Sequence, residues 1–341
     1  MSTFKTIISG RLEFGSARSY EKVIGLFQHR VESYYRNAVL LREYEEFFDT
    51  KDYAIDIPRL IVPDATEKHW KNTINLLKYI NDYAIAGNMR VWVIGDRKLV
   101  CEVFIEPTSD KVAVQSFLKG RELIKVEGME AEAMQALNRA IGKFERHALA
   151  YERRGYVNLQ LRNYKDAMYD FTKSIDINPN NAEPYWGRAN ILLKDNDING
   201  ALADLDMVTK KSIPHQTLHW NGRRLKGKYY LQTGEFEKAI FELKLFTNKK
   251  FKEDDNNYKY SEEALSNYGK ALLEFGEYSE AISVFNKALA VEEIETEPKA
   301  EQLFYRGIAR QKAGQSGFVK DFKEAAKLGS KKATEMLSAM A

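Results

Sequence analysis

Two histidines four residues apart, His215 and His219, come closest in this chain to the spacing of a metal site. That spacing would place both imidazoles on one face of a helix, and imidazole is a common zinc ligand. The sequence lacks the glutamate of the HisGluXaaXaaHis motif, and Pro214 directly precedes the pair. We therefore expect these histidines to pack beside Trp220, and we expect no metal ion or other cofactor.

No other arrangement of side chains indicates catalysis. The remaining histidines stand without a paired nucleophile, and neither the glycine-rich dinucleotide motif nor a phosphate-binding loop occurs. The acidic pairs that begin at Glu45 and Glu262 are typical of a solvated helix face rather than of acid–base catalysis. We expect no catalytic residue. The alternative is an enzyme with an active site in residues 1–107 and repeats that recruit its substrate, with Asp56, Arg59, Glu102 and His69 as candidates.

Composition and charge favour a folded protein without a polyanionic partner. Hydrophobic residues make up 44% of the 341 residues, so disorder is not expected, and the net charge is only +3. Short basic clusters begin at Arg223, Lys249 and Lys331, but acids flank most of them, so we expect no direct nucleic-acid binding. The single Cys101 cannot close an intramolecular disulfide, and no apolar run reaches about 18 residues. These features favour a cytoplasmic protein that is not inserted in a membrane.

The clearest organisation is a period of 34 residues in the second two thirds of the chain. Gly155, Ala167 and Phe171 occupy positions 8, 20 and 24 of a unit that starts at Ala148. Small residues at positions 8 and 20 let two helices approach closely, and large residues at positions 4, 11 and 24 fill the gaps between units. Because one unit cannot bury its apolar face alone, the units must stack. We place them near 113–147, 148–181, 182–215, 220–253, 262–295 and 300–333, with one residue inserted in the first and one deleted in the last.

These units resemble the tetratricopeptide repeat (TPR) family. The turn sequences LeuArgAsnTyr ending at Tyr164, GlyGluPhe ending at Phe236 and GlyGluTyr ending at Tyr278 carry the resemblance, together with AsnProAsn ending at Asn180. It covers about residues 110–330 and implies an all-α solenoid of five to six helix-turn-helix repeats. It also implies a non-enzymatic adaptor or scaffold that binds a peptide segment of a partner protein in a concave groove.

The resemblance also implies which residues face that groove, because positions 2, 5, 9, 12 and 13 of the inner helices line it in TPR proteins. The family's clamp for carboxylate ends is absent from the first stack, where Glu183 and Gly187 replace its final cations, and in the second stack Glu301 and Tyr305 replace them. A partial anion site at Arg224, Lys228 and Asn267 is a hypothesis. Aromatic and cationic side chains suit an extended peptide. The expected peptide-binding residues are Glu152, Tyr156, Trp186, Asn190, Arg224, Lys228, Asn267 and Lys270.

The first 109 residues lack the period and predict a separate small α+β domain, followed by the solenoid at 110–341. GlyAspArgLys at 95–98 predicts a hairpin, and Gly87 predicts a helix end. One face of the sheet is expected to pack on the helices and to cap the first repeats. Strands are expected at about 4–14, 53–62, 88–94 and 98–106, and helices at about 19–46 and 66–86.

Two departures from the period leave the continuity of the solenoid open. Extra residues at 216–219 and the polar stretch at 247–261 could divide it into two stacks, and the AspAspAsnAsn run at 254–257 predicts a solvated loop. A homo-oligomeric scaffold formed through stacked solenoid ends is a third possibility beside the adaptor and the enzyme.

Overall fold

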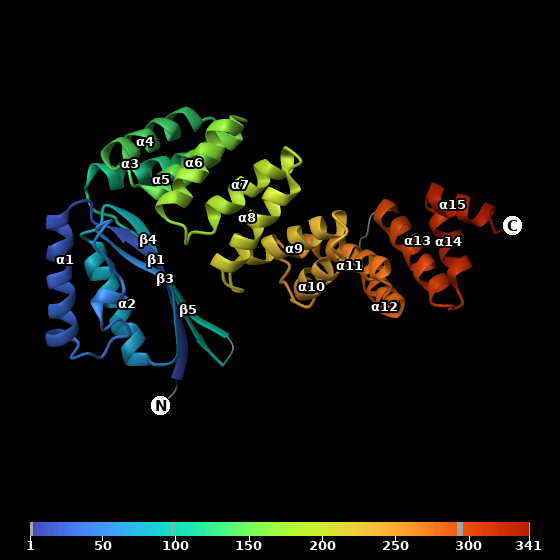
Figure 1. Ribbon diagram of the computed structural model, residues 1–341, viewed down its shortest axis with the longest axis horizontal. Helices are drawn as coiled ribbons and strands as arrows, with labels where there is room; N and C mark the ends of the chain where they lie inside the picture. Colours follow the sequence, from blue (N-terminus) through green and yellow to red (C-terminus); the bar gives the residue numbers. More distant parts are fainter. Residues whose placement is uncertain (1–2, 97, 292–295, 341) are drawn as a thin grey trace. The chain divides into compact units, whose positions relative to one another are not determined.

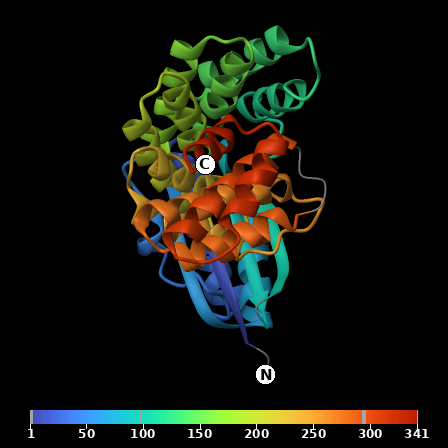
Figure 2. The ribbon, with the colours of Figure 1, turned by 90° about the vertical axis from the view of Figure 1, so that its right-hand side faces the viewer.

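The computed structural model describes residues 3–96, 98–291 and 296–340, and the chain divides into two compact units. The first unit, Met1–Ile191, contains a β-sheet with its covering helices and the first helical repeats (Figures 1 and 2). The second unit, Leu192–Ala341, contains helices throughout its described part. The boundary predicted after residue 109 falls between the last strand and the first repeat helix, and it stays a prediction.

The sheet has five antiparallel strands in the order β2-β3-β1-β4-β5. All four expected extended runs are strands, and a short additional strand, β2, lies at one edge. The predicted hairpin joins β4 to β5, where Gly95 pairs with Lys98, and Arg97 lies outside the described residues. The strands are β1 (Thr3–Glu13), β2 (Phe48–Asp49), β3 (Ala54–Thr66), β4 (Ala86–Gly95) and β5 (Lys98–Ile105).

Two helices, α1 (Ala17–His29) and α2 (Glu67–Asn81), cover one face of this sheet (Figure 1). Alternate residues of β1, such as Ile8 and Leu12, are buried against them because successive side chains of a strand point to opposite faces. On the other face, α5 of the second repeat packs on β4. The sheet therefore contacts both its own helices and the repeats, whereas Ile61 of β3 and Phe104 of β5 remain exposed.

Both helix ends predicted in this domain were wrong. The first helix ends at His29, continues as a π-helical turn over Arg30–Tyr34, and does not reach residue 46. Arg36 and Asn37 have positive φ angles, a conformation that cannot continue a right-handed helix. The second helix ends at Asn81, whereas Gly87 belongs to β4. There a Cβ atom would lie 2.0 Å from a backbone oxygen of β1, so this glycine serves close strand pairing rather than a helix end.

The helix-turn-helix repeats are confirmed, because two consecutive helices lie at each expected unit. A last short helix, α15 (Lys331–Ser338), packs on α14 after the final unit. The repeat helices are α3 (Val112–Leu123), α4 (Glu130–Lys143), α5 (Ala148–Gln160), α6 (Tyr164–Ile177), α7 (Glu183–Lys194), α8 (Ile198–Lys211), α9 (Thr217–Gln232), α10 (Phe236–Thr247), α11 (Ser261–Phe275), α12 (Tyr278–Leu289), α13 (Thr296–Lys312) and α14 (Phe318–Lys327).

The stack continues across both longer connections of the second unit, since α8 packs on α9 and α10 packs on α11. The predicted solvated loop is only partly solvated. Asn257 is fully buried, and its amide nitrogen donates a hydrogen bond to the carbonyl oxygen of Thr217 at 3.3 Å. A 3₁₀ turn at Tyr258–Tyr260 then leads into α11. The inserted residues thus form a connection packed on α9 rather than a break in the stack.

One contact between a glycine and a large side chain recurs within the repeats. The glycine at position 8 of the first helix faces the large residue at position 24 of the second, as Gly269 faces Phe285. A Cβ atom on Gly269 would lie 2.7 Å from that ring, closer than packed atoms approach. The same arrangement joins Gly120 to Leu137, Gly155 to Phe171, Gly227 to Leu243 and Gly307 to Phe322.

A buried ion pair also recurs, and the sequence analysis did not identify it. In three units a cation at position 7 of the first helix meets an acid of the second helix. Arg154 binds Asp170 through two hydrogen bonds of 3.0 and 2.6 Å, and Arg306 binds Asp321 in the same way. Lys226 pairs with Glu242 at the corresponding positions. Each pair joins the two helices of its unit at a point next to the glycine contact.

We predict that Gly269→Ala lowers the free energy of unfolding by about 1–3 kcal/mol, because the new methyl group overpacks the buried ring of Phe285. The matched control is Gly142→Ala, since Gly142 lies in α4 with nothing near its Cβ position. That change should stabilise the protein by about 0.5–1 kcal/mol through helix propensity alone. Urea unfolding followed by circular dichroism measures both; equal effects would contradict the packing argument.

A second prediction concerns His147, which is buried and caps α5 by accepting a hydrogen bond from the amide of Ala150 at 3.3 Å. Burial lowers its pKa to about 3, below the ordinary value of 6.5. The unfolded chain therefore takes up a proton below pH 6.5 that the folded chain excludes, so this contribution to stability is present above pH 6.5 and is lost as the pH falls toward 3.

The variant His147→Asn keeps a capping side chain without a titrating group. Relative to it, the natural protein should lose about 1.4 kcal/mol of unfolding free energy per pH unit below pH 6. Urea unfolding at pH 7.5, 6, 5 and 4 gives the difference between the two proteins. A constant difference over this range would show that His147 does not titrate as its burial requires.

Candidate peptide-binding groove

The expected peptide-binding residues lie on two groups of inner helices, one in each compact unit. In the first unit, α5 carries Glu152 and Tyr156, and α7 carries Trp186 and Asn190. In the second, Arg224 and Lys228 belong to α9, whereas Asn267 and Lys270 belong to α11.

In the first unit, Glu152 and Tyr156 are engaged with their own neighbours. Glu152 is 1% exposed, accepts a hydrogen bond from the amide of Asn181, and has its pKa raised by burial. The hydroxyl of Tyr156 donates to the backbone oxygen of Glu183 at 3.1 Å, and its ring packs edge-on against Phe171. This packing leaves Glu152 little surface for a ligand.

Trp186 and Asn190 are both partly exposed one helical turn apart on α7. The amide of Asn190 donates a hydrogen bond to the backbone oxygen of Trp186 at 2.8 Å.

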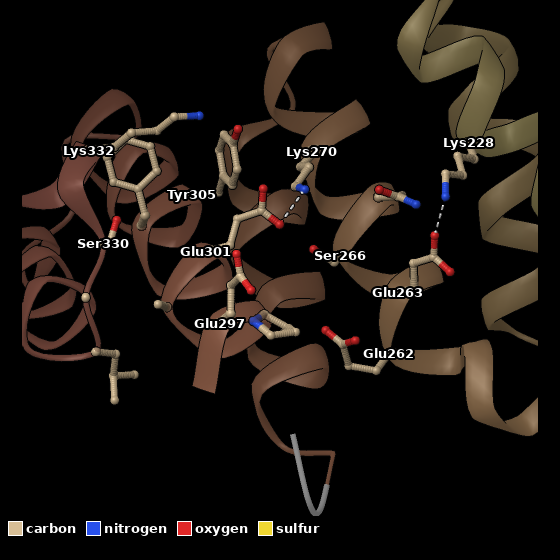
Figure 3. Close-up of a pocket in the computed structure, with 16 residues that line it drawn as sticks. Lys228, Glu262, Glu263, Ser266, Lys270, Glu297, Glu301, Tyr305, Ser330 and Lys332 are labelled. Atoms are coloured by element: carbon tan, nitrogen blue, oxygen red, sulfur yellow. Dashed lines mark hydrogen bonds and ion pairs between the residues drawn. The ribbon is translucent and has the colours of Figure 1, made fainter. Parts of the chain in front are cut away.

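In the second unit, Lys228, Asn267 and Lys270 line one cavity of about 820 Å³ (Figure 3). Its walls come from α9, α11 and α13, from the turn before α15 and from the first turn of α15. We call this cavity the groove. The other lining residues are Glu262, Glu263, Ser266, Glu297, Pro298, Ala300, Glu301, Phe304, Tyr305, Leu328, Gly329, Ser330 and Lys332.

The lysines expected to bind a ligand are already paired across neighbouring helices. Lys228 contacts Glu263 at 2.8 Å, and Lys270 contacts Glu301 at 2.8 Å (Figure 3). Arg224 is 9% exposed; its guanidinium lies 3.8 Å from the ring centre of Tyr260 and 3.6 Å from Glu263. Burial lowers its pKa. Arg224 and Lys228, the two cations of the hypothetical anion site, are thus both engaged with Glu263, which argues against that site.

The acidic pair at Glu262 was interpreted as a solvated helix face, and that interpretation was wrong. Both Glu262 and Glu263 are partly buried and line the groove. Glu262 accepts a hydrogen bond from the amide of Gln302, a fully buried residue of α13. Burial and the neighbouring Glu263 raise the pKa of Glu262. The expected solvation failed because α13 of the following repeat covers the first turn of α11.

Sequence reasoning missed Glu262, Glu297 and Lys332 as groove residues. Glu262 and Glu297 stand in the first turns of α11 and α13, where acids also stabilise a helix N-terminus, so their positions carried no separate signal. Lys332 belongs to α15, which lies outside the 34-residue pattern used to place inner helices. Its position in the groove follows from the packing of α15 on α14.

The candidates for an active site in the first domain do not converge. The ring of His69 contacts the hydroxyl of Thr66, which caps α2, at 2.6 Å. Asp56 lies on β3 and accepts from Arg11, whereas Glu102 lies on β5 and accepts from Trp92 at 3.0 Å. Arg59, also on β3, has its pKa lowered by burial. These side chains make separate structural contacts.

The histidine pair does not share a helix face, because His215 precedes α9 and His219 lies within it. His219 is buried beside Trp220, with Ser212 at 3.1 Å from its Nδ1 atom and the Nε of Arg223 donating to its Nε2 atom at 2.9 Å. Across the described ranges, no group of three or more histidine, cysteine or acidic residues could hold a metal ion.

A buried charge network in the first unit was also not expected from the sequence. Arg11 is 4% exposed and donates to Glu13 at 2.7 Å, to Asp56 at 2.6 Å and to Asp52 at 2.9 Å. Arg146, from the turn before α5, donates to Asp52 as well. This network connects the sheet to the repeats within the first unit.

The stacked helical pairs define an α-solenoid protein with repeats of about 34 residues. Family models of the tetratricopeptide repeat match residues 131–182, which span most of α4 through α6, and residues 262–294, which contain α11 and α12. Residues 131–182 and 262–294 therefore carry tetratricopeptide repeats. The matches support a role in protein–protein interaction. Within the described residues, no helix is long and apolar enough to cross a bilayer.

A comparison with solved structures found one TPR protein with a similar fold and further, weaker matches. YrrB, described as a TPR protein with an unusual peptide-binding site, has 14% identity and a TM-score of 0.51, covering 60% of this chain and 99% of its own. The pilF protein of Pseudomonas aeruginosa has 14% identity and a TM-score of 0.48, and the match covers 67% of this chain and 98% of pilF. No curated protein matches this chain in sequence.

We predict that Arg11→Met lowers the free energy of unfolding by about 3–5 kcal/mol, because it leaves buried carboxylates without their cation. Adding Glu13→Gln should recover part of the loss by removing the most buried of these charges. Arg146→Met, at the more exposed edge of the network, should cost about 1 kcal/mol or less. Urea unfolding measures all three; equal losses in the two arginine variants would refute a buried network centred on Arg11.

Proposed function

We propose that this protein is a non-enzymatic adaptor that binds a peptide segment of a partner protein in the groove of the second unit. The observation that carries the proposal is the cavity itself. Inner helices of three consecutive repeats supply its walls, and charged, amide and aromatic side chains line it. Polar groups fixed on rigid elements, beside aromatic and apolar surface such as Phe304 and Leu328, can hold an extended peptide.

The groove is held open by contacts on its far side. Glycine contacts and buried pairs bind each inner helix to its outer helix, so the lining side chains project from a fixed framework. Preorganised walls reduce the ordering that a peptide must impose when it binds. The ion pairs Lys228–Glu263 and Lys270–Glu301 also restrain their side chains across neighbouring helices.

The last helix favours peptide capture over end-to-end assembly. Ala333 of α15 is fully buried, and Met336 and Leu337 pack with Phe322 of the final repeat. The apolar surface that a second copy would need is therefore covered by the chain itself. In the same way, we propose that the α+β domain covers the other end of the array, since α5 packs on β4 and Arg146 joins the Arg11 network.

The experiment that tests this function fills the groove. Asn267 is partly exposed in the groove wall on α11, so Asn267→Trp places an indole where a peptide would lie. The matched control is Glu274→Trp, because Glu274 is exposed on the same helix but outside the lining residues. Proteins captured by the natural chain, identified by mass spectrometry, would then be titrated against both variants.

Asn267→Trp should weaken binding of the captured partner at least about tenfold, which corresponds to about 1.4 kcal/mol. Glu274→Trp should bind like the natural chain, and the far-ultraviolet circular dichroism of all three should agree. Equal binding by the two variants, or no captured partner, would contradict a groove-binding adaptor.

A further inference from the structure

The charges that line the groove are arranged with opposite signs at its two ends. Figure 3 shows Glu262 and Glu297 on one side of the cavity and Lys332 with Tyr305 on the other. The arrangement follows from helix position. Glu262 and Glu297 stand in the first turns of α11 and α13, whereas Tyr305 lies two turns farther along α13.

The acidic end retains charge after the groove's own pairs are counted. Lys228 and Lys270 neutralise Glu263 and Glu301, but the described residues supply no ion pair to Glu262 or Glu297. Burial and the neighbouring carboxylate of Glu263 raise the pKa of Glu262, and the more distant Lys270 only partly opposes them. A cationic group placed between Glu262 and Glu297 would offset their negative charge and favour the ionised form of Glu262.

The basic end is complementary to a carboxylate. Lys332 is exposed, and its ammonium group lies 6.0 Å from the ring centre of Tyr305. No ion pair to Lys332 is found in the part of the chain that the structure describes. The aromatic ring and Ser330 beside it give this end an apolar wall and a hydroxyl group.

The separation of the two ends sets the length of a ligand. Glu297 and Tyr305 are eight residues apart on α13, so they lie roughly 12 Å apart along the helix axis. An extended chain covers that distance in about four residues. The groove therefore fits a short segment that carries charges of both signs, rather than a uniformly acidic peptide.

We infer that the groove selects a peptide segment with a lysine or arginine side chain held between Glu262 and Glu297 and, about three to five positions away, a carboxylate held by Lys332. The inference rests on the proposed peptide-binding function and specifies its ligand. Charge-assisted hydrogen bonds to both ends fix the direction of the segment, because reversing it would place like charges together.

The test is selection of a random 12-residue peptide library, displayed on phage, on the full-length protein. The natural chain should enrich peptides with a basic and an acidic residue about three to five positions apart. The double variant Glu262→Gln with Glu297→Gln should abolish the preference for a basic residue. It should also lower the affinity for a selected synthetic peptide at least about tenfold, as measured by fluorescence polarisation. Lys332→Gln should abolish the acidic preference alone.

The matched control removes the same two charges elsewhere. Glu274 and Glu335 are exposed on α11 and α15 and do not line the groove, so Glu274→Gln with Glu335→Gln should select the natural set of peptides. If this control changes the preference as much as the groove variant does, net charge rather than the groove explains it and the inference falls.

The outcomes separate the inference from the function beneath it. Suppose that Asn267→Trp abolishes binding of the selected peptides, but those peptides carry no paired charges or are uniformly acidic. That result would overturn the inference and leave the adaptor function standing. If the library yields no peptide that Asn267→Trp excludes, the peptide-binding function fails, and the inference fails with it.

Discussion

The contact of a glycine on one helix with a large side chain on the next is the constraint on which the repeats depend. Because Gly269 has no side chain, the ring of Phe285 can lie against the backbone of α11, and the two helices approach closely. The same contact fixes the helix pair in four other units. Because the second helix of each repeat packs on one side of the first, the opposite side of the first helix is free to form a wall of the groove.

Charged side chains specify how these helices are arranged rather than adding much stability. The pairs Arg154–Asp170 and Arg306–Asp321 are bidentate and their carboxylates are buried, so removing Arg154 would leave the charge of Asp170 without its cation. The Arg11 network applies the same principle between the sheet and the repeats of the first unit. In the groove, by contrast, Glu262, Glu297 and Lys332 retain the capacity to bind groups from another molecule.

The repeats could be predicted closely, whereas the groove could be predicted only in part. A fixed period of small and large residues identifies helix pairs because every copy repeats the same local packing. Lys228, Asn267 and Lys270 were found by position, and they do line the groove. Glu152, found by the same rule, is buried, because Asn181 and Arg153 surround it. The position of a residue on a helix specifies its direction but not which neighbours cover it.

The sequence by itself determined the helix pairs, the sheet and the absence of a recognisable catalytic motif, because these depend on local periodicity and residue type. Tertiary structure alone decided the ends of the first two helices, where Gly87 pairs strands instead of ending a helix. It also decided which charges remain unpaired in the groove. Ion pairing depends on side chains from different helices, such as Lys270 and Glu301, whose distance no local pattern encodes.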